Sequence, residues 1–123
     1  MLYPGMEQQV VEDLRECAFG VFEGRTYEEL RDDPAYRRWL DSAGEIPPPG
    51  GEGKAESRAR VLGAFLPLME TRGSAALVVH GGTIMTLMEA LEDSREFYRW
   101  QVGCGEGLWC QWDGGRLICL GRV

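Results

Sequence analysis

The chain of 123 residues has few of the features that mark exported, membrane-spanning or metal-binding proteins. It lacks an apolar run long enough to cross a membrane, and residues 1–5 do not have the layout of a signal peptide. It holds a single histidine, and its four cysteines include no C-x-x-C pair, so neither a zinc site nor any other metal or cofactor is predicted. We therefore expect a cytoplasmic protein with free thiols and no membrane partner.

Positive charge is also scarce. The chain has 13 lysines and arginines and 20 aspartates and glutamates, which gives a formal net charge of −7. A protein that binds nucleic acid non-specifically needs a basic face, so this excess of acid argues against a nucleic-acid partner. It does not exclude a small anionic ligand, because a pocket sets its own local potential. The hydrophobic content of 44% and the length suit a soluble single domain over residues 1–123.

Capping signals predict two short helices after an extended connection over residues 13–22. Thr26 and Glu29 form a capping box, so a helix is expected from about Tyr27. Asp33-Pro34 offers a second N-cap, with proline at the first helical position. The apolar face of the second helix is formed by Tyr36, Trp39 and Leu40.

The rest of the chain predicts an α/β fold. A loop rich in proline and glycine over 44–53 precedes a long helix over 54–71, in which Pro67 predicts a kink or an early break. The apolar run Ala75–Val79 is typical of a strand buried on both faces. A helix over Thr83–Leu91 follows that strand. The last expected element is a C-terminal β-hairpin, with strands at 108–112 and 116–120 around a turn at 113–115.

His80 must carry any imidazole chemistry, because it is the only histidine. It follows the predicted strand at its carboxyl end, where open α/β sheets place their ligand crevice. Gly81 and Gly82 leave room for a ligand, and their amides and that of Thr83 open a helix whose N-terminus favours anions. This pattern fits an anion site and a tight strand–helix turn with a packed histidine about equally well.

Three glutamates and three arginines are weaker candidates. Glu16 lies beside Ala18 and Phe19, and apolar neighbours favour the protonated carboxyl that a general acid needs. On the pattern alone, a solvated surface glutamate is the better interpretation. Glu23 and Glu52 are suited to cap backbone amides in glycine-rich turns. Three arginines could bind phosphate: Arg25, Arg58 and Arg60. For each of them an ordinary role on the surface or in a helix is favoured.

Four stretches in a fixed order resemble one family. Residues 14–25 read L-R-E-C-A-F-G-V-F-E-G-R, with Phe22 where the family usually has tryptophan, and Y-E-E-L follows at 27–30. Pro48–Glu52 reads P-P-G-G-E before an arginine-bearing helix, and residues 76–84 read A-L-V-V-H-G-G-T-I. From Glu12 to the C-terminal hairpin the chain resembles the histidine phosphatase superfamily, the phosphoglycerate mutase-like proteins.

This resemblance implies a phosphomonoesterase that acts on a small phosphorylated metabolite through a phosphohistidine. Glu16 matches the proton donor, His80 matches the second histidine, and Gly81 matches a glycine whose amide assists it. Glu16 and His80 are therefore the predicted catalytic residues, and His80 and Gly81 the predicted phosphate ligands. The implied architecture is an incomplete phosphoglycerate mutase-like fold, an αβα-type sheet with flanking helices and a C-terminal β-hairpin.

One departure from the family is large. The family's nucleophilic histidine lies in an Arg-His-Gly tripeptide, which this sequence lacks, and Met85 replaces a frequent arginine. We expect a family member without its N-terminal third and with impaired turnover. The alternative is a non-catalytic remnant, or a truncated fragment, that binds phosphate or a protein partner. Since Ala75–Val79 would lack its partner strand, we also expect self-association as a homo-oligomer or strand-swapped dimer.

Overall fold

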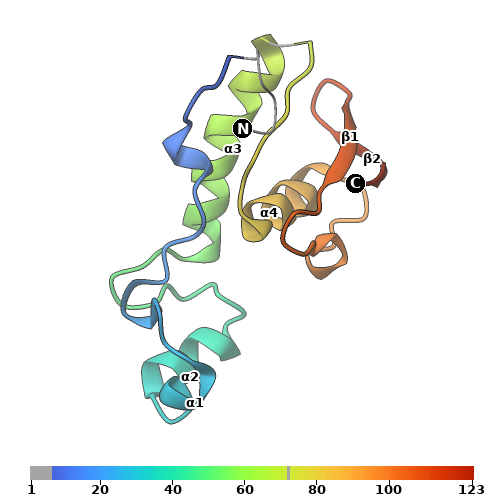
Figure 1. Cartoon of the computed structure of the whole chain (residues 1–123). Helices are drawn as coiled ribbons and strands as arrows, with labels where there is room; N and C mark the ends of the chain where they lie inside the picture. Colours follow the sequence, from blue (N-terminus) through green and yellow to red (C-terminus); the bar gives the residue numbers. More distant parts are fainter. Residues whose placement is uncertain (1–6, 72) are drawn as a thin grey trace.

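The computed structural model describes residues 7–71 and 73–123. Over these residues helices predominate, and the paired strands form one two-stranded antiparallel sheet (Figure 1). In chain order the elements are the 3-10 helices η1 (Glu12–Leu14) and η2 (Gly20–Phe22), the helices α1 (Tyr27–Leu30), α2 (Pro34–Asp41), α3 (Lys54–Thr71) and α4 (Gly81–Leu91), the 3-10 helix η3 (Tyr98–Trp100), and the strands β1 (Leu108–Trp112) and β2 (Leu117–Arg122).

Both predicted caps near the N-terminal end are confirmed. The Thr26 hydroxyl accepts a hydrogen bond from the Glu29 amide at 3.2 Å, and α1 begins at the next residue, Tyr27. The Asp33 carboxylate accepts from the Ala35 amide at 2.8 Å, and proline is the first residue of α2. The start of each helix depends on hydrogen bonds between residues that lie within four positions of each other. The sequence alone therefore predicts both helix starts.

The apolar face of α2 is narrower than predicted. The rings of Tyr36 and Trp39 lie 5.3 and 5.7 Å from the ring of Phe22, which is buried. Leu40, by contrast, is 45% exposed, so its inclusion in the face is wrong. Together with Phe19, whose ring lies 6.0 Å from that of Trp39, these aromatic rings form a small cluster beside α2.

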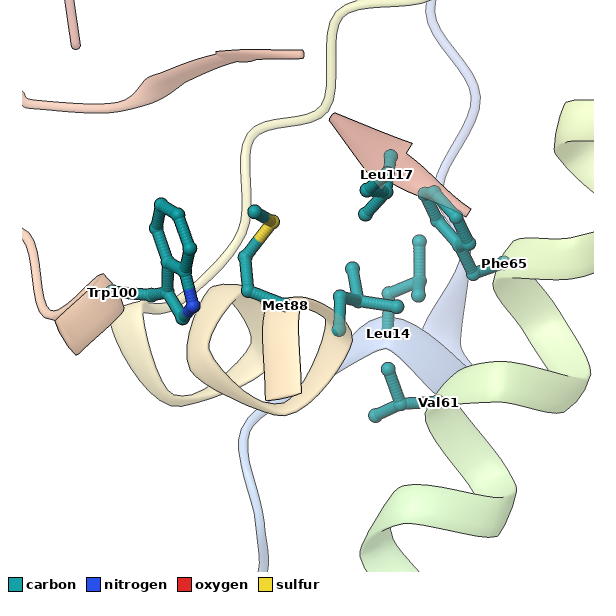
Figure 2. Close-up of a cluster of buried hydrophobic side chains, with 7 residues drawn as sticks. Leu14, Val61, Phe65, Met88, Trp100 and Leu117 are labelled. Atoms are coloured by element: carbon teal, nitrogen blue, oxygen red, sulfur yellow. The ribbon is translucent and has the colours of Figure 1, made fainter. Parts of the chain in front are cut away.

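The main core lies between α3, α4 and the hairpin. The predicted helix over 54–71 is confirmed as α3, and it continues through Pro67 to Thr71, so the expected break does not occur. η1 and α4 both contact α3. Figure 2 shows the apolar side chains that meet there, and the buried members of the cluster are Leu14, Val61, Phe65, Leu87, Met88, Trp100 and Leu117.

The predicted strand Ala75–Val79 is not a strand. The segment is extended and connects α3 to α4 (Figure 1), but no described residue pairs with it. The expectation of burial is also wrong, because Val78 is 76% exposed. A strand is defined by a hydrogen-bonded neighbour, and the described part of the chain supplies none to this segment.

The C-terminal hairpin is confirmed with a small shift. β1 has the predicted bounds, whereas β2 begins one residue later than predicted and extends to Arg122. The Asp113 amide donates to the Arg116 carbonyl at 2.9 Å and closes the turn. Gly114 and Gly115 have φ values of 60° and 145°, a conformation that glycine adopts without steric cost.

Candidate functional site

The start of α4 presents two backbone amides and an imidazole. His80 is the N-cap residue, with extended φ and ψ of −74° and 154°, and its side chain is exposed. The amides of Thr83 and Ile84 donate to the His80 carbonyl at 3.0 and 3.2 Å. Among the described residues, the amides of Gly81 and Gly82 have no acceptor. Two N–H groups beside an imidazole are suited to bind an anion.

Glu16 reaches the same helix end from a distant part of the sequence. A Cβ atom built on Gly82 would lie only 2.9 Å from Glu16 Cδ, so the carboxylate occupies the space that a larger residue would fill. The Cys17 amide donates to Glu16 Oε1 at 3.0 Å, and Glu16 is half-buried. The structure thus brings Glu16 next to the His80-Gly81-Gly82 turn, so this glutamate is not fully surrounded by solvent.

A buried hydrogen bond fixes the segment that precedes Glu16. The Thr83 hydroxyl donates to the Leu14 carbonyl at 3.0 Å, and Thr83 is 2% exposed. Leu14 itself belongs to the main core. The backbone beside Glu16 is therefore bound to the first turn of α4, two residues after Gly81.

Arg60 holds the same segment from the other side. Its guanidinium donates to the carbonyls of Asp13, Arg15 and Glu16 at 2.7, 3.0 and 3.4 Å. It also forms a two-bond pair with the Glu52 carboxylate, with both distances 2.8 Å. Because these acceptors occupy the guanidinium, Arg60 acts as a structural residue and not as a free phosphate ligand.

Glu52 and Glu23 cap backbone amides, as predicted. Glu52 Oε1 accepts from the Ala18 amide at 3.0 Å, and Glu23 Oε1 accepts from the Phe19 amide at 2.8 Å. The hydrogen bonds from Arg60 lower the pKa of Glu52 to about 2, against the opposing effect of burial. Glu52 is thus charged at neutral pH and joins α3 to the residues around Glu16.

The other two candidate arginines are paired with carboxylates. Arg58 Nη2 lies 2.9 Å from Glu89 Oε1, which joins α3 to α4. Arg25 lies 3.8 Å from Glu29 on the exposed surface of α1. Both arrangements agree with the ordinary structural roles that the sequence favours over phosphate binding.

An open groove runs along the extended segment that leads to His80. It has a volume of about 620 Å³ and lies between residues 7–12 and residues 74–80, with Arg15 also on its walls. Within the part of the chain that the structure describes, no group of three or more metal-ligating side chains occurs. Across residues 7–71 and 73–123, no helix is both long and apolar enough to cross a membrane.

Sequence reasoning missed the residues that assemble the site. It did not predict the hydrogen bond of the Thr83 hydroxyl or the close approach of Glu16 to Gly82. It also did not predict that Arg60 and Glu52 act together. Val102 was missed too, and its carbonyl lies 3.9 Å from a Cβ built on Gly81. The one available signal was the second glycine after His80, since two adjacent glycines at a helix start indicate close approach by another group.

A family model described as histidine phosphatase superfamily (branch 1) matches residues 3–120. The chain belongs to this superfamily. The family is one of enzymes, phosphatases and mutases, and the predicted membership is confirmed. A search of the curated proteins gave no match.

Solved structures confirm the fold class of this histidine phosphatase superfamily member. The protein TTHB049 from Thermus thermophilus is 31% identical with a TM-score of 0.69, and the match covers 97% of this chain and 60% of that one. A phosphoglycerate mutase from the same organism is 28% identical with a TM-score of 0.66, and the match covers 97% of this chain and 62% of that one. The chain thus spans about 60% of the length of these structures, and over that part it has the predicted phosphoglycerate mutase-like fold with its C-terminal hairpin.

Proposed function

We propose that the start of α4 binds the phosphoryl group of a small phosphorylated metabolite, in a phosphomonoesterase of the histidine phosphatase type. The observation that carries this proposal is the position of the Glu16 carboxylate against Gly82, beside His80. Glu16, His80 and the two free amides would then surround one small volume, although 64 positions separate Glu16 from His80 (80 − 16). Membership of the superfamily supports the reaction class.

Each group has a distinct role in this proposal. The amides of Gly81 and Gly82 and the His80 side chain stabilise the phosphoryl oxygens, on which negative charge is spread in the transition state. The Glu16 carboxyl donates a proton to the leaving oxygen of the ester. This transfer lets the leaving group depart as a neutral alcohol when its bond to phosphorus breaks.

The nucleophile is the missing part of this scheme. A phosphohistidine route uses one imidazole to attack phosphorus and another to hold its oxygens, and this chain has one histidine. We therefore propose that the chain alone turns over phosphomonoesters slowly or not at all. The single histidine favours a second candidate function, phosphate binding without turnover.

Phosphate-dependent melting tests the binding site. Phosphate at ten times its dissociation constant would stabilise the fold by about 1.4 kcal/mol, and should raise the melting temperature by a few degrees over chloride at equal ionic strength. His80→Gln should lose this increase, whereas Glu28→Gln, at an exposed position on α1, should keep it. The same increase in His80→Gln, or none in the unchanged protein, would refute the proposal.

Hydrolysis of p-nitrophenyl phosphate separates the two candidate functions. Slow or absent hydrolysis together with phosphate-dependent stabilisation supports binding without turnover. Robust hydrolysis that His80→Gln abolishes would show that His80 serves without a second histidine, and would overturn the expected impairment.

The position of Glu16 can be tested without any activity. Gly82→Ala should displace the carboxylate and change the NMR chemical shift of the Cys17 amide, which donates to it. Gly81→Ala is the matched control, because a Cβ there meets only the Val102 carbonyl at the ordinary contact distance of 3.9 Å. Equal shifts in the two variants would place Glu16 elsewhere.

A further inference from the structure

Two cysteines face each other across the C-terminal hairpin, away from the residues that form the proposed phosphate site. Cys110 on β1 and Cys119 on β2 are direct partners in the strand register, next to a register shift between Trp109 and Cys110. Both are free thiols and both are half-buried. Neither has a role in the site at the start of α4.

The hydrogen-bond pattern shows which kind of pair they form. The Asp113 amide donates to the Arg116 carbonyl, so these two residues are a hydrogen-bonded pair. Paired residues in an antiparallel ladder alternate between hydrogen-bonded and non-hydrogen-bonded positions. The register is unbroken from the turn to Cys110, so the third pair beyond Asp113 and Arg116, Cys110 with Cys119, is non-hydrogen-bonded.

That position matches the geometry of a disulfide. Residues in a non-hydrogen-bonded pair have Cα atoms about 4.5 Å apart, with their side chains on the same face of the sheet. Disulfides join cysteines whose Cα atoms are roughly 4.4 to 6.8 Å apart. The typical Cα separation of such a pair therefore lies within the range that a disulfide spans.

The two cysteines differ in their surroundings. Cys119 lines an open hollow of about 390 Å³ between β2 and residues 92–100. Burial, and next the neighbouring Cys119, raise the pKa of Cys110 to about 11, so Cys110 is a neutral thiol at pH 7. Because the thiolate is the nucleophile, Cys110 is a poor first nucleophile, and the first attack on an oxidant is assigned to its partner in the pair.

We propose that Cys110 and Cys119 are a dithiol site that a low-molecular-weight disulfide, such as glutathione disulfide, oxidises to an intramolecular disulfide. The Cys119 thiolate attacks one glutathione sulfur, forms a mixed disulfide and releases one glutathione thiolate. Cys110, after losing its proton, attacks the Cys119 sulfur and displaces the second glutathione thiolate. The protein loses two electrons and two protons: the glutathione disulfide takes up the electrons as its S–S bond breaks, and the two thiolates it releases take up the protons to become two thiols.

Oxidation would crosslink the two strands of the hairpin that packs on the main core. Leu117 on β2 is buried in the main core, and both cysteines pack against that core. A crosslink between the strands restricts the unfolded chain and leaves the folded pairing unchanged. The oxidised protein should therefore melt at a temperature roughly 5 to 10 °C above that of the reduced protein.

Peptide mapping after incubation with glutathione disulfide tests the site. Trypsin cleaves after Arg99, Arg116 and Arg122, so the predicted crosslink joins peptide 100–116 to peptide 117–122. Peptide 100–116 also contains Cys104, so the mapping is done in Cys104→Ser, whose exposed position makes it a mild change. The expected result is this crosslinked pair, together with the higher melting temperature, and its loss on reduction.

Two variants complete the test. Cys119→Ser should lose both the crosslink and the increase in melting temperature, whereas Cys17→Ser, far from the hairpin in sequence, should keep both. Because the mapping itself uses a protein with both cysteines, a folding defect in Cys119→Ser would not remove the result. Glutathione attached singly to either cysteine, or crosslinks between two copies of the chain, would overturn the proposal.

Discussion

At the scale of single residues, Arg60 and Glu52 form the connection on which the position of Glu16 depends. The pair is largely buried, with 11% and 16% of the side chains exposed, and its other partners are backbone groups between Asp13 and Ala18. A bidentate pair with such partners has fixed geometry, because a planar guanidinium directs its donors along set lines. Removing either partner would leave the other charge buried without compensation.

Acid should weaken the fold through Glu52. Its pKa is about 2 in the folded chain against 4.5 for a free glutamate, so its contribution is complete above about pH 4.5 and is lost as the pH falls through 2. A difference of this size corresponds to about 3 kcal/mol. Urea unfolding at pH 7 and pH 3 should show Glu52→Gln to be less stable at pH 7 and to have a flatter pH dependence.

The control for this prediction is Glu45→Gln, at an exposed position in the same loop. It should leave both the stability and its pH dependence unchanged. If Glu52→Gln kept the same free energy of unfolding at pH 7, the pair would contribute nothing to stability.

The sequence indicated some of these residue roles and not others. The capping by Glu23 and Glu52 could be predicted, because glycine-rich turns present free amides to any nearby carboxylate. The role of Arg60 could not, since its carbonyl acceptor at Asp13 lies 47 positions away. Local patterns contain no information about partners that only the folded chain brings together.

At the scale of elements, helices were predicted more accurately than the segment Ala75–Val79. A helix satisfies its own backbone, so the caps at Thr26 and Asp33 were enough to locate α1 and α2. A strand needs a second strand, and its apolar residues predict burial only where that second strand exists. Within residues 7–71 and 73–123, Ala75–Val79 keeps the extended backbone that its residues favour, without the ladder or the burial.

This segment should promote association between copies of the chain. It has no charged residue, and Leu77 and Val78 are exposed, with Val78 at 76%. An extended apolar segment with unpaired backbone groups can pair with the same segment of a second copy. Sedimentation velocity should detect dimers or larger species that become more abundant with concentration, and Val78→Lys should reduce them.

Val21→Lys provides the matched control. Val21 is also exposed, at 55%, but it lies in η2 near the opposite end of the molecule (Figure 1). The change adds the same charge and should leave association unaffected. A monodisperse monomer at high concentration, or equal effects of the two lysines, would contradict association through Ala75–Val79.

At the scale of the whole molecule, the apolar side chains form two separate groups. The main core joins η1, α3, α4, η3 and β2, whereas α2 has no buried residue and packs through Tyr36 and Trp39 onto Phe22. Figure 1 shows α1 and α2 beyond the lower end of α3, apart from α4 and the hairpin. Regions with few buried apolar contacts open more readily than the core does.

Hydrogen exchange should therefore differ between the two ends. We expect the amides of α2 to exchange at least about tenfold faster than those of α4 in native-state exchange followed by mass spectrometry. Trp39→Ala should accelerate exchange in α1 and α2 and leave α4 unchanged. Leu40→Ala, at a position that is 45% exposed, should have little effect, and uniform exchange along the chain would contradict this division.

The buried bond from Thr83 to the Leu14 carbonyl has a consequence for how a ligand would be received. It joins the first turn of α4 to the backbone near Glu16, so a buried contact links the elements that carry Glu16 and the two glycine amides. A ligand bound as proposed would meet groups that this contact already holds in place. Binding would then order little of the protein, so affinity would be decided mainly by the exchange of water for fixed dipoles and charge.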